Sequence, residues 1–202
     1  MPLRRRRARR KPSRPRDSQK RKVYAAESVL KGKMPLADID AAAKLVGKLL
    51  NAAVFKHRYD LRLEHSPVHV GLTRRDSGHS WGSVKGIRLH PEWGLDGYIV
   101  CHEMAHVVAL RIYGRENIAA HGWQWAEIYL ILVLAGMGRA AHDELKASFK
   151  AAGIRFTKPR QGRVLTQDQR KALAERLEAA RKMRIVGSGE NRLTGATAMV
   201  ES

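Results

Sequence analysis

The sequence predicts an α+β fold in which several helices accompany a small β-sheet. Residues 67–73 and 84–89 are short runs typical of strands, and Ser77-Gly78 between them suggests a hairpin turn or loop. Stretches on both sides of these runs repeat their apolar residues at helical spacing. Apolar residues make up 44% of the 202 residues, which is enough for one domain with a core.

Two helices are predicted ahead of the strands. The first covers residues 16–30, where Val23, Ala26 and Val29–Leu30 recur at helical spacing. The second begins near Asp38, because aspartate is a preferred N-cap. Its apolar face consists of Ile39, Ala42, Val46, Leu49 and Ala53.

Four helices are predicted after the strands. They cover about residues 96–113, 121–134, 140–151 and 166–184. The glycines at Gly136 and Gly138 end the second of them. Thr166 and Gln169 form a capping-box pattern at the start of the last one.

The positive charge of the chain is concentrated at its two ends. The net charge is +20, of which residues 1–33 carry +12, residues 34–154 only +2, and residues 155–202 +6. Dense charge without apolar residues predicts disorder. The sequence therefore predicts a disordered basic arm (1–15), a folded domain (16–154), a basic linker with a C-terminal helix (155–186) and a disordered tail (187–202).

The basic arm is expected to bind a polyanion, such as DNA, RNA or an acidic protein. Its side chains would neutralise phosphates and release counterions, with little sequence preference and a steep salt dependence. The alternative is a solvated tail that only aids solubility. The cations concerned are Arg4, Arg5, Arg6, Arg7, Arg9, Arg10 and Lys11.

Several classes of protein are excluded by what the sequence contains. The single cysteine, Cys101, cannot form an internal disulfide or a four-cysteine zinc ribbon, and we expect it to be a buried thiol. The N-terminus has no apolar segment of the kind found in secretory signals. The longest apolar run, 128–135, is far shorter than the about 20 residues of a membrane span. We expect a soluble, intracellular protein without a membrane partner.

The chemistry is concentrated in residues 102–106, which read His-Glu-Met-Ala-His. Residues i and i+4 lie on the same face of a helix, so His102 and His106 are spaced to bind one zinc ion. Glu103 would then lie beside the metal, where a carboxylate acts as general base toward a bound water. The alternative is two buried histidines hydrogen-bonded within a core.

A catalytic zinc site needs a third protein ligand and one open position. The metzincin spacing is excluded, because Ala109 and Ile112 stand where that class has glycine and histidine. Two downstream residues remain, His121 at 15 residues after His106 and Glu127 at 21 residues after it. Spacing alone leaves both open.

The pair of motifs H-E-M-x-H at 102–106 and H-G-x-x-W at 121–125 resembles the SprT-like zinc metallopeptidases. That group includes Spartan-type proteases, which act on DNA-crosslinked proteins. The resemblance implies a zincin-like fold, in which the HExxH helix is followed by a helix bearing the third ligand. It implies one Zn²⁺ per chain, bound by His102, His106 and His121, with Trp125 packed behind the third ligand.

A second resemblance lies near the N-terminus. Arg-Asp-Ser-Gln at 16–19 and Val-Tyr-Ala-Ala-Glu at 23–27 resemble the start of small metallohydrolase-like proteins of actinobacteria and their phages. Together the two resemblances cover about residues 16–150. They imply a zinc metallopeptidase with Glu103 as general base, acting on peptides or on nucleic-acid-associated proteins. The implied location is the cytoplasm of a bacterial or phage-infected cell, in association with the nucleoid.

Two parts of such a mechanism stay open. Tyr113, Tyr129 and His142 are equally eligible to stabilise an oxyanion. The predicted strand at 84–89, just ahead of the HExxH helix, is a candidate edge for pairing with an extended substrate. Its alternative is an ordinary core strand.

Two other functions compete with the peptidase. One is a basic nucleic-acid-binding or virion-associated module with a structural or vestigial zinc site, and the other is a zinc hydrolase of non-peptide substrates. Glu103 favours an enzyme, because a structural site has no use for a base and usually closes with a fourth ligand.

Overall fold

The computed structural model describes residues 15–53 and 67–159, together with part of 166–180. The chain divides into two compact units, Met1–Lys158 and Pro159–Ser202. In the second unit the described residues within 167–180 are helical, where the sequence predicts a C-terminal helix. The predicted arm up to residue 14, which includes the seven cations from Arg4 to Lys11 expected to bind a polyanion, lies outside the described residues, as does the predicted tail at 187–202.

The first unit confirms the α+β class. Within the described residues, its secondary structure begins with three helical elements, continues with three short strands, and ends with three helices. In order, the elements are α1 (Lys20–Glu27), η1 (Ser28–Leu30), α2 (Ile39–Asn51), β1 (His69–Leu72), β2 (Trp81–Ser83), β3 (Gly86–Leu89), α4 (Gly97–Tyr113), α5 (Trp123–Met137) and α6 (Arg139–Ala151).

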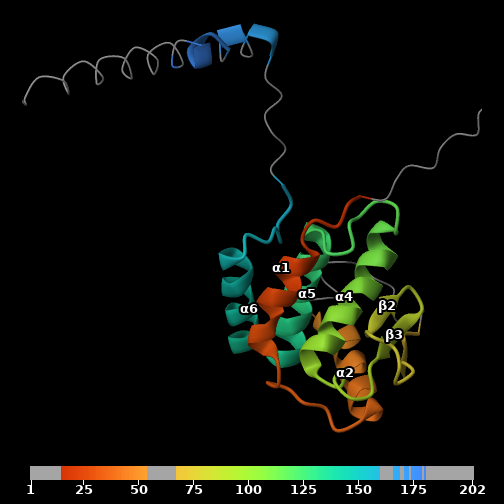
Figure 1. Ribbon diagram of the computed structural model, residues 1–202. Coiled ribbons are helices and arrows are strands. Elements are labelled where there is room, and N and C mark those ends of the chain that lie inside the picture. The colour runs from red at the N-terminus through yellow and green to blue at the C-terminus, as the bar shows by residue number, and fades with distance from the viewer. Residues whose placement is uncertain are drawn as a thin grey trace, which may run out of the picture. The chain divides into compact units, whose positions relative to one another are not determined.

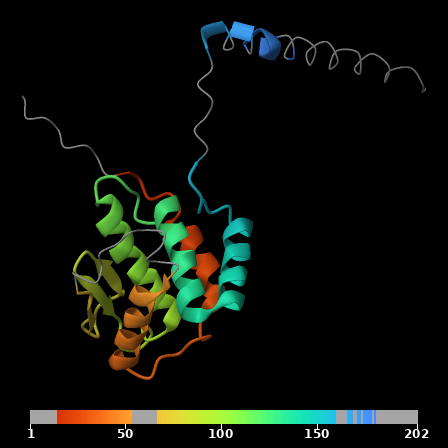
Figure 2. The ribbon, with the colours of Figure 1, turned by 180° about the vertical axis from the view of Figure 1, so that it is seen from behind.

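Helix α4 lies at the centre of this unit. It packs on β2 and β3 on one side and along α5 on another, while α2 contacts both helices. Figure 1 shows the strands on one side of α4 and helices α1 and α6 on the other, and Figure 2 shows α2 on the reverse face. Because α4 is covered all round, polar side chains on it must find partners inside the protein.

The helix ends follow the signals in the sequence. The Asp38 carboxylate accepts a hydrogen bond from the backbone N–H of Ala41 at 2.8 Å and so caps α2, as expected. Gly138 separates α5 from α6 with a φ of +93°, a conformation that favours glycine. This left-handed residue turns the chain so that α6 packs back against α5.

The sheet decides between the alternatives for two expectations. Strands β1 and β3 are parallel neighbours, so Ser77-Gly78 lies in a loop of the crossover between them and does not form a hairpin turn. The three-residue strand β2 pairs antiparallel with β3, giving the order β1-β3-β2. The predicted strand at 84–89 is therefore β3, the central strand, and the idea that its edge pairs with substrate is wrong because both of its edges are already paired.

No helix within the described residues is long and apolar enough to cross a membrane.

Candidate metal centre

Helix α4 carries His102, Glu103 and His106 through the middle of the core. It begins after Asp96, whose carboxylate accepts a hydrogen bond from the backbone N–H of Tyr98 at 3.4 Å. His102 and Glu103 are buried, and His106 is half-buried. The i, i+4 spacing brings the two imidazoles together, with ring centroids 5.1 Å apart.

The third histidine comes from the turn that connects α4 to α5. The sequence predicts His121 at the start of a helix, but α5 begins at Trp123 with Gly122 as its N-cap. The turn is fixed by two hydrogen bonds. The Gly122 N–H donates to the Ala119 carbonyl at 3.1 Å, and the Gln19 side-chain amide donates to the His121 carbonyl at 2.8 Å. His121 is therefore buried in a defined position although it belongs to no helix.

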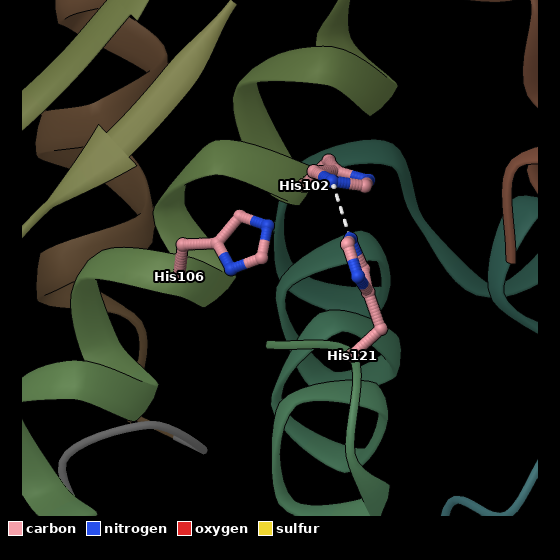
Figure 3. A group of neighbouring side chains, drawn as sticks. All are labelled: His102, His106 and His121. Atoms are coloured by element: carbon pink, nitrogen blue, oxygen red, sulfur yellow. Dashed lines mark hydrogen bonds between the residues drawn. The ribbon is translucent and has the colours of Figure 1, made fainter. Parts of the chain in front are cut away.

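The three histidines converge on one point (Figure 3). One ring nitrogen from each lies within 4.8 Å of the others, and the Nε2 atoms of His102 and His121 are 3.4 Å apart. A tetrahedral metal ion with nitrogen ligands at about 2.0–2.1 Å separates those nitrogens by roughly 3.3–3.4 Å. The spacing of this pair is thus the spacing of two nitrogens that share a metal ion. Glu127, the other candidate third ligand, is not in the donor group found among the described residues.

Two carboxylates from the N-terminal segment orient two of these rings. Glu27 at the end of α1 lies with its Oε2 2.7 Å from Nδ1 of His102, and Asp17 lies with its Oδ2 2.7 Å from Nδ1 of His121. A carboxylate accepts a hydrogen bond, so each ring carries its proton on Nδ1. The Nε2 lone pairs are then free to bind a metal, which is the usual carboxylate–histidine–metal arrangement.

The facing nitrogens of His102 and His121 require a positive charge between them. Two neutral rings protonated on Nδ1 would direct their Nε2 lone pairs at each other across 3.4 Å, which is repulsive. A metal ion satisfies both lone pairs at once. A proton on one of the two rings is the other solution. Burial lowers the pKa of His102, but the Glu27 carboxylate outweighs burial and raises this pKa overall. Burial lowers the pKa of His121, so His102 is the ring that would carry the proton.

The chemistry of the donor set fits a divalent transition metal. Three neutral imidazoles suit zinc, copper, iron or nickel, and no thiolate is among the donors. The thiol of Cys101, on the same helix, is completely buried and lies 3.6 Å from the Leu132 carbonyl oxygen. Burial raises its pKa to about 12, so it stays protonated, as expected for a structural thiol.

Trp125 closes the back of the centre. Its buried ring lies 4.7 Å from that of His121 and 4.8 Å from that of His102, measured between centroids. This is the packing position that the SprT-like resemblance implies for Trp125. The ring excludes water from the inner side of the histidines, so access to the centre must come from the opposite side.

Glu103 is buried beside the histidines and close to strand β2. Burial is the main cause that raises the pKa of its carboxyl to about 7; Glu27 adds to this rise, while His102 and a hydrogen bond with the Gly82 backbone oppose it. Strand β2 approaches α4 so closely here that a Cβ on Gly82 would clash with the backbone oxygen of Glu103. Glycine at position 82 therefore permits the contact between the strand and the helix at the centre.

Two cavities meet at the metal centre. The larger, about 580 Å³, is lined by His102 and extends past Tyr98 and Trp93. The smaller, about 280 Å³, is lined by His106 and by residues of β2. Glu103 borders both cavities, so the side chain proposed as base lies where they meet.

Tyr24 of α1 also borders both cavities. Its ring stacks on His102 at 5.6 Å with an interplanar angle of 8° and meets the edge of His121 at 5.5 Å. Burial raises its pKa to about 12, with contributions from Glu103, Glu27 and Asp17, so the phenol keeps its proton.

The structure thus brings His102, Glu103, His106 and His121 together, as the sequence predicts. The sequence patterns do not reveal the roles of Asp17, Glu27 and Tyr24, although all three lie within the second resemblance, near the N-terminus. A signal was present, because Asp17 and Glu27 are the two acidic residues among 14 basic ones in residues 1–33.

Comparison with models of known protein families, with curated proteins and with solved structures finds no match.

Proposed function

We propose that this protein is a zinc-dependent metallopeptidase of SprT-like type with a zincin-like fold. The observation that carries the proposal is the set of three histidine nitrogens around one point, with an adjacent carboxylate, Glu103, at the junction of two cavities. A structural zinc site closes with four protein ligands, whereas a catalytic one keeps a position open. The described residues offer three grouped donors and a base, which favours catalysis.

His102, His106 and His121 would hold the metal through their ring nitrogens. Bound there, a zinc ion supplies Lewis acidity, lowering the pKa of water and polarising a carbonyl. Glu27 and Asp17 keep the Nδ1 protons of His102 and His121 in place, so that both Nε2 atoms stay directed at the metal.

Glu103 would move the proton. Its carboxylate accepts a proton from the attacking water as the water oxygen bonds to the carbonyl carbon of the peptide. It then donates that proton to the amide nitrogen as the C–N bond breaks. The products are a carboxylic acid and an amine, and Glu103 returns to its starting form. Trp125 keeps bulk water from the inner side of the centre.

The proposed substrate is a polypeptide segment that lies across both cavities. Strand β2 is the edge strand beside the centre, and Trp81, Gly82 and Ser83 line the smaller cavity. Proximity to nucleic acid remains a prediction from the basic arm. A substrate among DNA- or RNA-associated proteins in the bacterial or infected cell follows from that prediction.

The decisive experiment combines zinc content with activity. Wild type is purified with zinc present and compared with H121A, E127A and E103Q by elemental analysis, and each is assayed on an unfolded protein substrate with and without DNA. We expect one zinc per chain in wild type, E127A and E103Q, and loss of zinc in H121A. E103Q should also lose at least about 100-fold in kcat, because the base is absent.

Two outcomes would contradict the proposal. Zinc-free wild type after zinc-replete purification would remove the metal centre. Full activity of E103Q would show that hydrolysis does not use this base. E127A serves as the matched control, because Glu127 is the competing ligand on the neighbouring helix α5.

A further inference from the structure

The geometry around Tyr24 suggests a role that the metal ligands and Glu103 do not fill. The oxyanion that forms on the attacked carbonyl can be stabilised by a hydrogen-bond donor in addition to the metal ion. The sequence leaves this donor open among Tyr113, Tyr129 and His142. A role for Tyr24 in binding the attacked carbonyl rests on the proposed function.

The three sequence candidates are poorly placed for this task. Tyr129 is completely buried, and its hydroxyl donates to the Tyr98 carbonyl oxygen at 3.4 Å. His142 lies on α6 with its Nδ1 2.7 Å from the carboxylate of Asp143. Tyr113, near the end of α4, lines neither of the two cavities at the centre. None of the three offers a donor at the point where substrate would react.

Tyr24 is placed at that point. It is 48% exposed although its ring is packed on two of the three histidines. Its neighbours on α1, Val23 and Glu27, are buried and fix the helix against the core. The stacking on His102 restrains the ring, so Tyr24 can border both cavities without a large loss of side-chain freedom on binding.

Only three side chains border both cavities among the described residues, and they are Tyr24, Ser80 and Glu103. Ser80 is only 9% exposed, and its hydroxyl oxygen accepts a hydrogen bond from the backbone N–H of His90 at 2.9 Å, which holds the side chain toward the residue after β3. Tyr24 is 48% exposed, and no hydrogen bond of its hydroxyl is found within the described part of the chain. A substrate that occupies both cavities therefore borders a proton acceptor, Glu103, and a proton donor, Tyr24.

We propose that the Tyr24 hydroxyl donates a hydrogen bond to the oxygen of the scissile carbonyl as that oxygen becomes negatively charged. Tyr24 keeps its proton throughout, and no covalent bond to it forms or breaks. The hydrogen bond strengthens as the charge develops, so it stabilises the transition state more than the bound substrate. Tyr24 is thus a catalytic residue supplied by the N-terminal segment.

Tyr24→Phe tests the proposal, because it keeps the ring on His102 and removes only the hydroxyl. We expect kcat on the unfolded protein substrate to fall about 100-fold with little change in KM, as for other single oxyanion donors. Zinc content should stay at one per chain. Tyr113→Phe is the matched control, since it removes the hydroxyl of a tyrosine that lines neither cavity, and its kcat should stay within about twofold of wild type.

A binding measurement separates this proposal from the proposed function. The probe is a tetra-alanine phosphinic peptide, in which a tetrahedral phosphinate replaces the central peptide bond. Tyr24→Phe should weaken its binding to the zinc-loaded protein by at least about tenfold, because the phosphinate oxygen takes the place of the oxyanion. The affinity of unmodified tetra-alanine, measured by its inhibition of the protease assay, should change by less than about threefold.

Each result decides one of the two proposals. If Tyr24→Phe matches wild type in kcat and in phosphinate affinity, the role of Tyr24 is refuted while the peptidase stands. If Tyr24→Phe loses zinc, the tyrosine supports the histidines and the oxyanion role is refuted. If wild type hydrolyses no protein and binds no phosphinate, the peptidase fails and the role of Tyr24 fails with it.

Discussion

His102 and His121 have the same hydrogen-bond chemistry but are held by different kinds of structure. Each ring lies 2.7 Å from a carboxylate oxygen through Nδ1. His102 belongs to the buried helix α4, and its partner Glu27 has a side chain only 8% exposed. His121 belongs to a turn, and its partner Asp17 is 22% exposed and precedes α1 by three residues.

The centre therefore has two halves. His102 and Glu27 are part of the buried core, whereas His121 and Asp17 lie at its edge, in a turn and in the segment before α1. Around His102, the groups that would orient a metal ligand are also part of the buried core. Tyr129 illustrates this, because its buried hydroxyl is also close to Glu27, and burial together with that carboxylate raises its pKa well above the usual value. Around His121, the turn is fixed by side chains of the N-terminal segment. Changes there should affect metal binding with little effect on the rest of the fold.

The largest effect is expected from Glu27→Gln. Loss of the charged acceptor should lower zinc affinity by about 100-fold, as for other carboxylates that orient a histidine ligand. It should also lower the free energy of unfolding of the metal-free protein by about 1–3 kcal/mol, because buried polar partners are left poorly satisfied. Zinc affinity is measured by competition with a chelating dye, and stability by urea unfolding.

The control for this variant is Glu92→Gln, an exposed carboxylate paired with Arg75 on the surface. It should change neither quantity measurably. If Glu27→Gln leaves the unfolding free energy intact, the His102 half of the centre is not tied to the core.

Asp17→Asn should have a smaller effect, confined to zinc affinity. We expect zinc affinity to fall about tenfold. The free energy of unfolding without metal should change by less than about 0.5 kcal/mol, because the Asp17 side chain is partly exposed. The same dye competition and urea unfolding give both values, and Asp76→Asn, a surface carboxylate near Arg74, is the control. A destabilisation equal to that of Glu27→Gln would abolish the distinction between the two halves.

Truncation of the N-terminus should have the smallest effect on the centre. Removal of residues 1–14 should leave zinc affinity within about twofold of wild type, because Asp17 and Gln19 remain. The same truncation should weaken binding to DNA and flatten its salt dependence, since it removes eight cations, the seven from Arg4 to Lys11 and also Arg14. Zinc competition and DNA titrations at several salt concentrations report the two properties.

Removal of residues 1–19 provides the contrast. It takes away Asp17 and Gln19 and should lower zinc affinity at least as much as Asp17→Asn. Equal zinc affinities for the two truncated proteins would show that the contacts of Asp17 and Gln19 with His121 are not needed for zinc binding.

The same contrast explains what the sequence could predict. His102, Glu103 and His106 lie within five consecutive residues of one helix, so local spacing is sufficient to find them. His121 is 15 residues further on and was distinguished from Glu127 only through the SprT-like resemblance. The carboxylate partners are separated from their histidines by 75 and 104 residues, and no helical or strand periodicity relates such distant positions.

The sheet was harder to predict than the helices for a related reason. Asp38 and Asp96 cap α2 and α4 through contacts within three residues, so their signals are local. Strand β2 has only three residues, one of which is Gly82, and no alternation can be recognised in so short a run. The parallel pairing of β1 with β3 depends on a crossover that passes through β2, which the turn residues alone do not show.

Gln19 links the beginning of this folded unit to its end. Its side-chain amide nitrogen donates to the carbonyls of His121 and Arg155, and its amide oxygen accepts from the Arg155 backbone N–H. During synthesis on the ribosome, Gln19 emerges early but reaches Arg155 only after residue 155 has left the exit tunnel. A shorter nascent chain lacks the contacts that hold Gln19 in place, so the turn carrying His121 is fully fixed only when the chain has finished this unit.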